Sequence, residues 1–421
     1  MKFKAWQVTL VAGAVVAGLA GIATVTGAID LRSQARLTGV GIPVSASATS
    51  TPTKTVTASP TLNPLAPRVQ HPPSDQRRLR VTKRLVGPFS PKSVVASGTG
   101  LVLAANMMYR HTITVFSSKG EVIKTIQDKV NLRGFGQRDY PEGTFRGAPV
   151  ETAISPDGKY AWVSNYAMYG KGFSAEGKDN CPGSNSLSES FVYRVNLKKR
   201  VIDGVIEVGK TPKYLATTPD GATLLVANWC SYDLSIVDIA SMKEVHTVRL
   251  GPHPRGIAVT KDSRTAYVAV MGSAGIAKVD LKTRAVSWIR GVGVAPRHVV
   301  LSPDEKTLYA SVNGTGQIVS VNTATKKVID RVSTGRQPRS LAISPDGTAL
   351  YVVNYASGNM TKLRARDLKI LQTVKTDVHP IGITYDPVTE SVWVSCYRGV
   401  VYVMADRGTS KRKKATPTPS P

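Results

Sequence analysis

Basic side chains recur at one position of a regular proline pattern in this chain of 421 residues. Five prolines from 212 to 380 stand 42 residues apart, and two more, at 91 and 149, precede them. The residue after the proline is basic in five of the seven copies, where the composition predicts about one. These cations are Lys92, Lys213, Arg255, Arg297 and Arg339, and the two exceptions are Val150 and Ile381. Cations fixed at one position of a repeat suit the binding of an anionic group by charge-assisted hydrogen bonds.

Aromatic residues occupy a second repeated position, in the turn after the second apolar segment of a copy. They are Tyr166, Trp229, Tyr355 and Tyr397. Cations beside aromatic faces suit an anionic ligand that carries bases or sugars, because such rings stack on aromatic side chains. The same arginines would also suit a structural role in which they cap backbone carbonyls between repeats, and the sequence leaves both interpretations open. Another aromatic set lies inside the apolar segments, where we expect core packing: Trp162, Tyr267, Tyr309, Tyr351 and Trp393.

The copy over residues 337–378 shows which elements position these side chains. Its apolar residues are β-branched or aromatic and roughly alternate with polar ones, which indicates strands rather than helices. The pattern predicts four strands, at 340–344, 349–355, 359–364 and 369–376. The segment Ser344-Pro345-Asp346-Gly347 fits a type I turn, because proline presets φ at its second position. Four strands in one repeat of about 42 residues are typical of a propeller blade.

Seven copies predict an all-β, seven-bladed β-propeller with four-stranded blades over residues 78–407. The last copy supplies three strands before the chain turns polar. Residues 79–87 resemble a fourth strand that leads into the next blade, at 245–252, so we expect them to complete blade seven and close the ring. In an up-and-down blade, the turns after strands two and four share one face. The cations and aromatic residues should therefore surround the channel mouth on that face.

Several copies resemble the YVTN-repeat family of β-propellers. The resemblance is carried by SPDGTALYVVNYASGNMTKL (344–363) and TPDGATLLVANWCSYDLSIVDI (218–239), and it extends over about residues 79–407. It implies a seven-bladed propeller of a kind that is often extracytoplasmic and often has no assigned reaction. Because propellers include binders, scaffolds and enzymes, the fold alone does not specify a function.

Two additions to the repeat are candidate functional loops. Residues 131–148 and 167–190 interrupt the first two copies, and strand order predicts that both lie on the same face, beside each other. Cys181 lies in the second addition and Cys230 in the corresponding turn of the next copy, so a disulfide between them is possible in an oxidising compartment. We expect Cys396 to be a buried free thiol. No CxxC pair indicates a zinc site.

The two ends of the chain predict a membrane or secretory context. Residues 5–29 carry no charge and follow Lys2 and Lys4, so the segment 1–30 is either an uncleaved signal anchor or a cleaved signal peptide. Residues 31–77 are predicted to form a disordered linker rich in serine, threonine and proline, and residues 408–421 a disordered basic tail. We therefore expect a single-pass cell-membrane protein with its propeller outside the cytoplasm, or a secreted protein.

The formal net charge of +27 favours anionic partners. The candidates are an anionic cell-surface polymer, a nucleic acid or an acidic protein, and the alternative is a generally basic, soluble surface. We expect a monomer without a cofactor. The leading interpretation is a binding module, and a purely structural cell-surface protein is one alternative to it.

A lactonase-like hydrolase is the other alternative. The segment Ala295-Pro296-Arg297-His298 resembles one in 6-phosphogluconolactonase-like propellers, which also use arginine and histidine with a carboxylate. The turn that follows it in this chain, at 312–314, has no acid, and Glu151 is the one carboxylate close to an opening proline. Such an enzyme would require a carboxylate and a histidine that converge in the channel.

Overall fold

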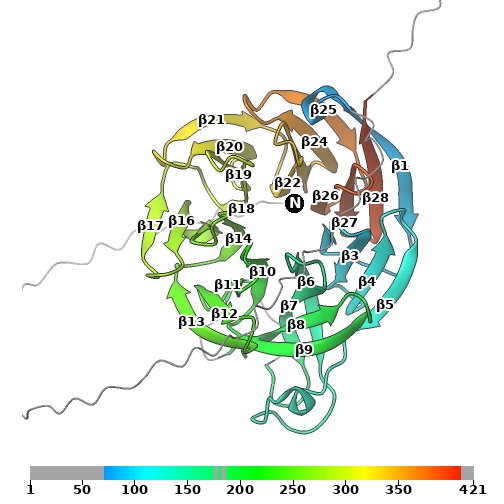
Figure 1. The fold of residues 1–421 in the computed structure, drawn as a ribbon, viewed down its shortest axis with the longest axis vertical. Helices are drawn as coiled ribbons and strands as arrows, with labels where there is room; N and C mark the ends of the chain where they lie inside the picture. The colour runs from blue at the N-terminus through cyan, green and yellow to red at the C-terminus, as the bar shows by residue number, and fades with distance from the viewer. Residues whose placement is uncertain (1–70, 175–178, 182–185, 409–421) are drawn as a thin grey trace, which may run out of the picture. The chain divides into compact units, whose positions relative to one another are not determined.

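The computed structural model describes residues 71–174, 179–181 and 186–408. These residues form seven four-stranded antiparallel sheets arranged as blades around a central axis (Figure 1), which confirms the predicted seven-bladed propeller. The predicted signal segment 1–30, most of the predicted linker and most of the predicted tail lie outside the described residues. Among the residues described, no helix is long and apolar enough to cross a membrane.

In blades one to three the first strand faces the axis and the fourth forms the outer edge (Figure 1). Blade one contains β2 (Ser93–Ala96), β3 (Leu101–Asn106), β4 (Thr112–Ser117) and β5 (Val122–Gln127). Blade two contains β6 (Arg146–Ile154), β7 (Tyr160–Tyr169), β8 (Ser190–Asn196) and β9 (Val201–Val208). Blade three contains β10 (Pro212–Thr217), β11 (Thr223–Asn228), β12 (Asp233–Asp238) and β13 (Lys243–Arg249).

Blades four to six repeat this arrangement. Blade four contains β14 (Pro254–Val259), β15 (Thr265–Val270), β16 (Gly275–Asp280) and β17 (Val286–Ile289), with the short 3-10 helix η3 (Met271–Ser273) after β15. Blade five contains β18 (Pro296–Leu301), β19 (Thr307–Val312), β20 (Gln317–Asn322) and β21 (Val328–Ser333). Blade six contains β22 (Pro338–Ile343), β23 (Ala349–Asn354), β24 (Asn359–Arg364) and β25 (Ile370–Lys375), each within two residues of its predicted bounds.

The core lies between neighbouring blades and is built mainly from the second and third strands. The five aromatic residues expected to pack there are at most 4% exposed, which confirms the expectation for Trp162, Tyr267, Tyr309, Tyr351 and Trp393. Burial of such large rings contributes roughly 1.5–3 kcal/mol each. This packing between blades fixes where each inner strand begins.

Blade seven joins the two ends of the propeller. It contains β26 (Pro380–Asp386), β27 (Ser391–Cys396), β28 (Val400–Arg407) and, as its outer strand, β1 (Arg78–Val86). β1 pairs antiparallel with β28 from Arg78 opposite Arg407 to Val86 opposite Val400. This pairing is the predicted closure of the ring by the N-terminal strand.

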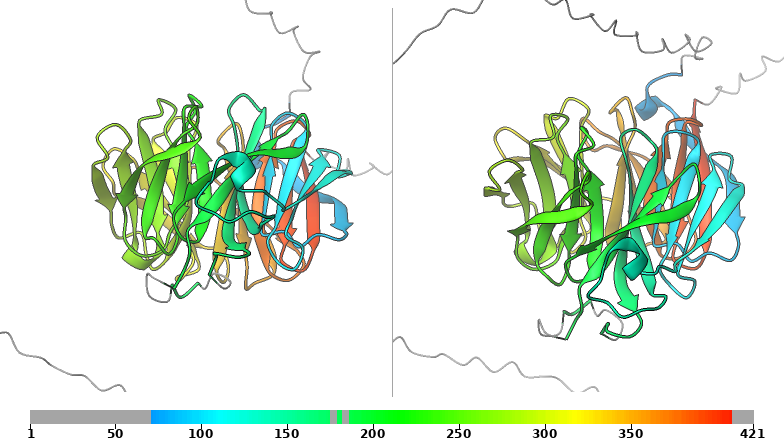
Figure 2. Two further views of the ribbon diagram at one scale, coloured as in Figure 1. Left: turned by 90° about the horizontal axis from the view of Figure 1, so that it is seen from below. Right: turned by 60° about the horizontal axis from the view of Figure 1, so that its bottom comes forward.

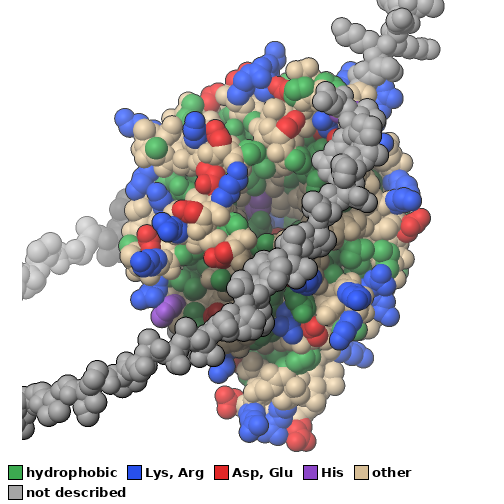
Figure 3. Space-filling view, viewed as in Figure 1, with side chains coloured by type: hydrophobic (Ala, Val, Ile, Leu, Met, Phe, Trp, Pro, Cys, Tyr) green, Lys and Arg blue, Asp and Glu red, His purple; other side chains and the backbone are tan. Residues whose placement is uncertain are grey.

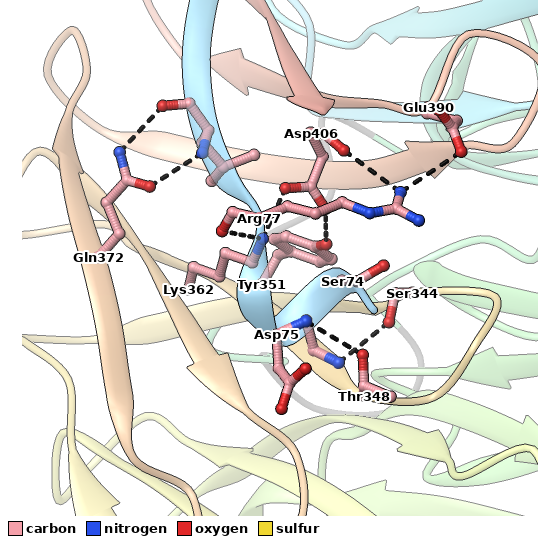
Figure 4. A network of polar contacts seen from close by, with 12 residues as sticks. Ser74, Asp75, Arg77, Ser344, Thr348, Tyr351, Lys362, Gln372, Glu390 and Asp406 are labelled. Atoms are coloured by element: carbon pink, nitrogen blue, oxygen red, sulfur yellow. Dashed lines mark hydrogen bonds and ion pairs between the residues drawn. The ribbon is translucent and has the colours of Figure 1, made fainter. Parts of the chain in front are cut away.

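A buried ion pair reinforces the closure (Figure 4). The side chains of Lys362 on β24 and Asp406 on β28 are fully buried, and Lys362 Nζ lies 2.5 Å from Asp406 Oδ1. Lys362 Nζ also donates a hydrogen bond to the carbonyl of Arg77 at 3.0 Å, and the Tyr351 hydroxyl donates to Asp406. The ion pair therefore links blade six, blade seven and the chain segment that enters β1.

The prediction of a disordered linker up to residue 77 is wrong for residues 71–77. They include the 3-10 helix η1 (Ser74–Gln76), whose Ser74 N–H donates to Asp346 Oδ2 at 2.8 Å. Asp75 forms an ion pair with Arg366, whose Nη1 lies 3.1 Å from Asp75 Oδ2. Polar contacts with blade six order this segment. The prediction of disorder rests on the lack of apolar residues, and composition does not show such contacts.

The buried pair provides a test of the closure. Asp406→Leu should leave Lys362 without its carboxylate and lower the free energy of unfolding by about 3–5 kcal/mol. The double variant Lys362→Met/Asp406→Leu should recover most of this loss, because no unpaired charge remains buried. Urea unfolding of both variants measures the difference, and an equal loss in both would contradict the account.

Candidate functional site at the channel mouth

The opening turn of each blade fixes the predicted site residues. In blades three to seven the residue before the opening proline has positive φ, between 55° and 64°. Its carbonyl accepts a hydrogen bond from the residue after strand two, at 3.0 Å in the pairs Trp229–Thr211, Tyr355–Gln337 and Tyr397–His379. In blades three and six this contact brings the aromatic residue next to the cation that follows the proline, and in blade seven it places Tyr397 beside Lys92 of blade one.

The five repeated cations come together at the mouth of the channel. Lys213, Arg255 and Arg297 are buried, with at most 9% of their surface exposed, and Lys92 and Arg339 are partly exposed. Burial holds the pKa of Lys92 well below its usual range, and the other four cations add to this effect. Figure 3 shows the opposite face of the ring, where Lys and Arg side chains are spread around the edge and the centre is hollowed.

The three mouth arginines do not cap carbonyls. In the described part of the chain, none of Arg255, Arg297 and Arg339 donates to a backbone oxygen. Arg339 Nε is buried without a hydrogen-bond partner, and Arg297 Nη1 reaches only Met271 Sδ, at 3.8 Å. The structure therefore does not support the structural alternative for these side chains. Carbonyl capping on this face is done by other arginines, namely Arg249, Arg290 and Arg336.

Each predicted aromatic residue lies against a mouth cation. Lys213 Nζ lies 3.8 Å from the ring centre of Trp229 and 5.2 Å from that of Tyr166. The Arg339 guanidinium lies 3.5 Å from the ring centre of Tyr355, and Lys92 Nζ lies 5.2 Å from that of Tyr397. Tyr166 and Trp229 are buried, whereas Tyr355 and Tyr397 are partly exposed. Of these four aromatic residues, only Tyr355 and Tyr397 are accessible to a ligand.

The insertion in blade two places a carboxylate at the mouth. Asp179 forms an ion pair with Lys213 at 2.5 Å and accepts a hydrogen bond from the Tyr166 hydroxyl at 2.7 Å. Although burial opposes ionisation, Lys213 holds the pKa of Asp179 well below its usual range. The Asp179 carbonyl accepts from Trp229 Nε1 at 2.8 Å. Sequence reasoning missed Asp179, because nothing in an insertion of irregular sequence marks which residue faces the channel.

A disulfide joins this insertion to the neighbouring blade. Cys181 and Cys230 are bonded, with a Cα–Cα distance of 5.2 Å, whereas Cys396 is a buried free thiol. No group of three or more His, Cys, Asp or Glu side chains in the described ranges is arranged to hold a metal ion.

The two insertions lie beside each other, as predicted. The loop between β5 and β6 contains the short helix η2 (Arg133–Phe135), and both it and the loop between β7 and β8 project from the ring (Figures 1 and 2). Tyr140 of the first insertion stacks on Phe173 of the second, with ring centres 5.1 Å apart.

One residue further along the inner strands, a second layer of polar side chains crosses the channel. The Nε2 atom of His298 on blade five lies 2.7 Å from the hydroxyl oxygen of Tyr214 on blade three. Its Nδ1 accepts from the Leu341 N–H at 3.2 Å, so the neutral ring carries its proton on Nε2. Burial lowers the pKa of His298 to about 3, which keeps it neutral. Gly256 occupies this position on the blade between them, where an added Cβ would lie 2.6 Å from His298 Cα.

Glu151 lies in the same layer. Burial raises its pKa to about 7, even though Arg255 and Lys92 favour the carboxylate. Glu151, Tyr214 and His298 line one cavity of about 400 Å³. The channel therefore holds both a carboxylate and a histidine, as the enzyme hypothesis requires. Sequence reasoning missed Tyr214, although it occupies the same place after its proline as Glu151 and His298 do.

Comparisons with known proteins agree with this fold. The sequence model of the family described as "Lactonase, 7-bladed beta-propeller" matches residues 238–384, a segment that contains Arg255, Arg297 and Arg339 but not Glu151. Hydrazine synthase of Kuenenia stuttgartiensis is a similar solved structure, with a TM-score of 0.60 and 18% identity over 76% of this chain and 96% of that one. At this identity the similarity shows the fold alone. No curated protein matches the chain. The protein is thus a seven-bladed β-propeller, and the segment 238–384 is similar to the lactonase family model.

Asp179 provides a test of the mouth as an anion site. Asp179→Asn removes one negative charge beside the cations, so it should tighten the binding of inorganic phosphate about fivefold or more at low salt. Titration calorimetry measures the affinity. The matched control is Asp157→Asn, in the turn after strand one on the opposite face, which should leave the affinity unchanged. Unchanged or weaker binding by Asp179→Asn would contradict this role.

Proposed function

We propose that this protein binds an anionic ligand at the channel mouth. The observation that carries the proposal is the excess of positive charge in a buried site. The five cations Lys92, Lys213, Arg255, Arg297 and Arg339 share the mouth with two carboxylates of the described residues, Asp179 and Glu151. Burial lowers the pKa of Lys213 to about 7 although Asp179 lies beside it. A bound anion would remove this electrostatic penalty.

The ligand class we favour is an anionic polymer or an acidic partner. The net charge of +27 would attract such a partner over a distance, and the mouth would bind one of its acid groups. An anionic cell-surface polymer, a nucleic acid and an acidic protein all have suitable groups. The resemblance to YVTN-repeat propellers and the uncharged segment 5–29 support a protein that acts outside the cytoplasm, at the cell membrane or secreted.

Removal of the mouth arginines tests this proposal. The triple variant Arg255→Gln/Arg297→Gln/Arg339→Gln should lose at least tenfold in affinity for a polyanion panel of polyphosphate, an acidic polysaccharide and a single-stranded oligonucleotide. The matched control is Arg249→Gln/Arg290→Gln/Arg336→Gln, which removes the same charge from arginines that cap carbonyls. Equal losses in both variants would show that net charge, not the mouth, drives binding. Circular dichroism establishes that each variant is folded.

Anion binding should tighten as the pH falls through 7. In the free protein Lys213 and Glu151 both have pKa values of about 7, so lowering the pH charges the lysine and neutralises the carboxylate. Both changes make the mouth more positive. Sulfate, which stays a dianion throughout this range, should therefore bind with proton uptake and more tightly at pH 6 than at pH 8.5. Calorimetry in buffers with different ionisation enthalpies measures the uptake, and an affinity that does not change with pH would refute the assignment.

Hydrolysis of an anionic lactone is a second candidate, favoured by the lactonase-type segment and by the position of Glu151. A carboxylate with a pKa of about 7 is suited to act as a general base near neutral pH. Glu151 would take a proton from the water that attacks the lactone carbonyl, and a mouth arginine would stabilise the oxyanion. Collapse of this intermediate breaks the ring C–O bond, the protonated Glu151 returns its proton to the leaving oxygen, and a hydroxy acid is formed. His298 acts as a positioning residue for Tyr214, because both of its ring nitrogens are engaged.

Glu151→Gln separates the two functions. The variant should lose at least a hundredfold in kcat for any lactone that the wild type hydrolyses, because the amide cannot accept the proton. It should bind phosphate as well as the wild type or better, since a negative charge has been removed. A panel of carboxylated and phosphorylated lactones measures turnover. Failure of the wild type to hydrolyse any of them would exclude this candidate and leave the binding proposal intact.

A further inference from the structure

A second cavity lies beside the mouth, between blades seven and one. It has a volume of about 660 Å³, within the range of small-molecule sites. We call it the rim cleft, and the residues that define it are Phe89, Tyr109, Arg110, His379, Tyr397 and Arg398. They come from the connection between β1 and β2 and from the turns on the same face as the mouth.

The rim cleft is continuous with the mouth through Tyr397. This side chain lines the cleft and also lies under Lys92, whose Nζ is 5.2 Å from the ring centre. The Tyr355 ring stands 6.4 Å from Tyr397 and stacks on His379 at 4.5 Å. The cations Arg339 and Lys92 and the rings of Tyr355 and Tyr397 therefore lie together between the mouth and the cleft.

The chemistry of the rim cleft is that of an anion site with ring faces. Arg110 and Arg398 line it, no carboxylate does, and neither arginine forms an ion pair with any described residue. Tyr109 is 87% exposed, a large aromatic side chain on the surface with no ring or cation of the described residues against it. Its φ of 63° lies in the left-handed region, which a bulky residue rarely adopts. The turn thus holds the Tyr109 ring at the cleft with its face exposed to solvent.

We propose that the rim cleft binds a ring of the ligand whose acid group is held at the mouth. The ligand is then an anion that carries a ring able to stack on an aromatic face, of which the bases of nucleotides and the rings of acidic sugars are the two common sources. The ring would stack on Tyr109 and Tyr397, and Arg110 and Arg398 would bind hydroxyls or a second acid group. This inference rests on the proposed anion site, and it specifies that the acid group bound there belongs to a molecule with a ring.

Three probes with the same acid group test the rim cleft: inorganic phosphate, adenosine 5′-monophosphate and galactose 1-phosphate. At least one ring-bearing phosphate should bind the full-length protein about tenfold more tightly than inorganic phosphate does. Tyr109→Asn should abolish that gain and leave phosphate affinity unchanged, because asparagine accepts a positive φ and removes only the ring. The matched control is Trp288→Asn on β17 of blade four, which removes a ring that lies 4.3 Å from Arg290 and should leave the gain intact.

The outcomes separate this inference from the function on which it rests. Ring-bearing phosphates that bind no more tightly than phosphate, or a gain that survives in Tyr109→Asn, would overturn the rim cleft and leave the mouth in place. No phosphate binding by the wild type would overturn both. A gain with only one of the two ring-bearing probes supports the inference and identifies the ring as a base or a sugar.

Discussion

Closure of the ring by β1 is the constraint on which the rest of the structure depends. An open row of blades would leave one face of its first blade and one face of its last blade unpacked, and here the pairing of β1 with β28 in blade seven joins the two ends of the propeller. The buried Lys362–Asp406 pair and the contacts of residues 71–77 link that blade to blade six. Only a closed ring brings the first and last blades together, where Lys92 of blade one lies over the Tyr397 ring of blade seven.

The closed ring turns a repeated sequence position into a cluster of charge. Five cations that are at least 42 residues apart in sequence come within electrostatic range of each other, in a setting where burial opposes their charge. Asp179 neutralises one side of this cluster, next to Lys213, and is held there by the Cys181–Cys230 bond. The side formed by blades six, seven and one keeps its cations and rings open. This asymmetry gives the mouth a covered half and a half that can accept a ligand.

The repeat made the fold and the first layer of the site predictable. Regular spacing after the opening prolines located the five cations, and the turn position located the four rings beside them. The second layer was not predictable as a unit, because the His298–Tyr214 contact spans two blades and depends on Gly256 leaving room between them. Asp179 and residues 71–77 were missed for another reason, since contacts between segments distant in sequence place them. Contacts that recur in every blade can be predicted from the sequence repeat, whereas a contact made only once across the ring leaves no periodic pattern in the sequence.

The most direct measurement is a crystal structure grown with tungstate, a heavy analogue of phosphate that can be located by its anomalous signal. The account predicts a tungstate at the channel mouth, within hydrogen-bond distance of at least two of Arg255, Arg297, Arg339 and Lys92. Tungstate bound only at the surface arginines, with an empty or water-filled mouth, would contradict the claim that the five mouth cations form an anion site.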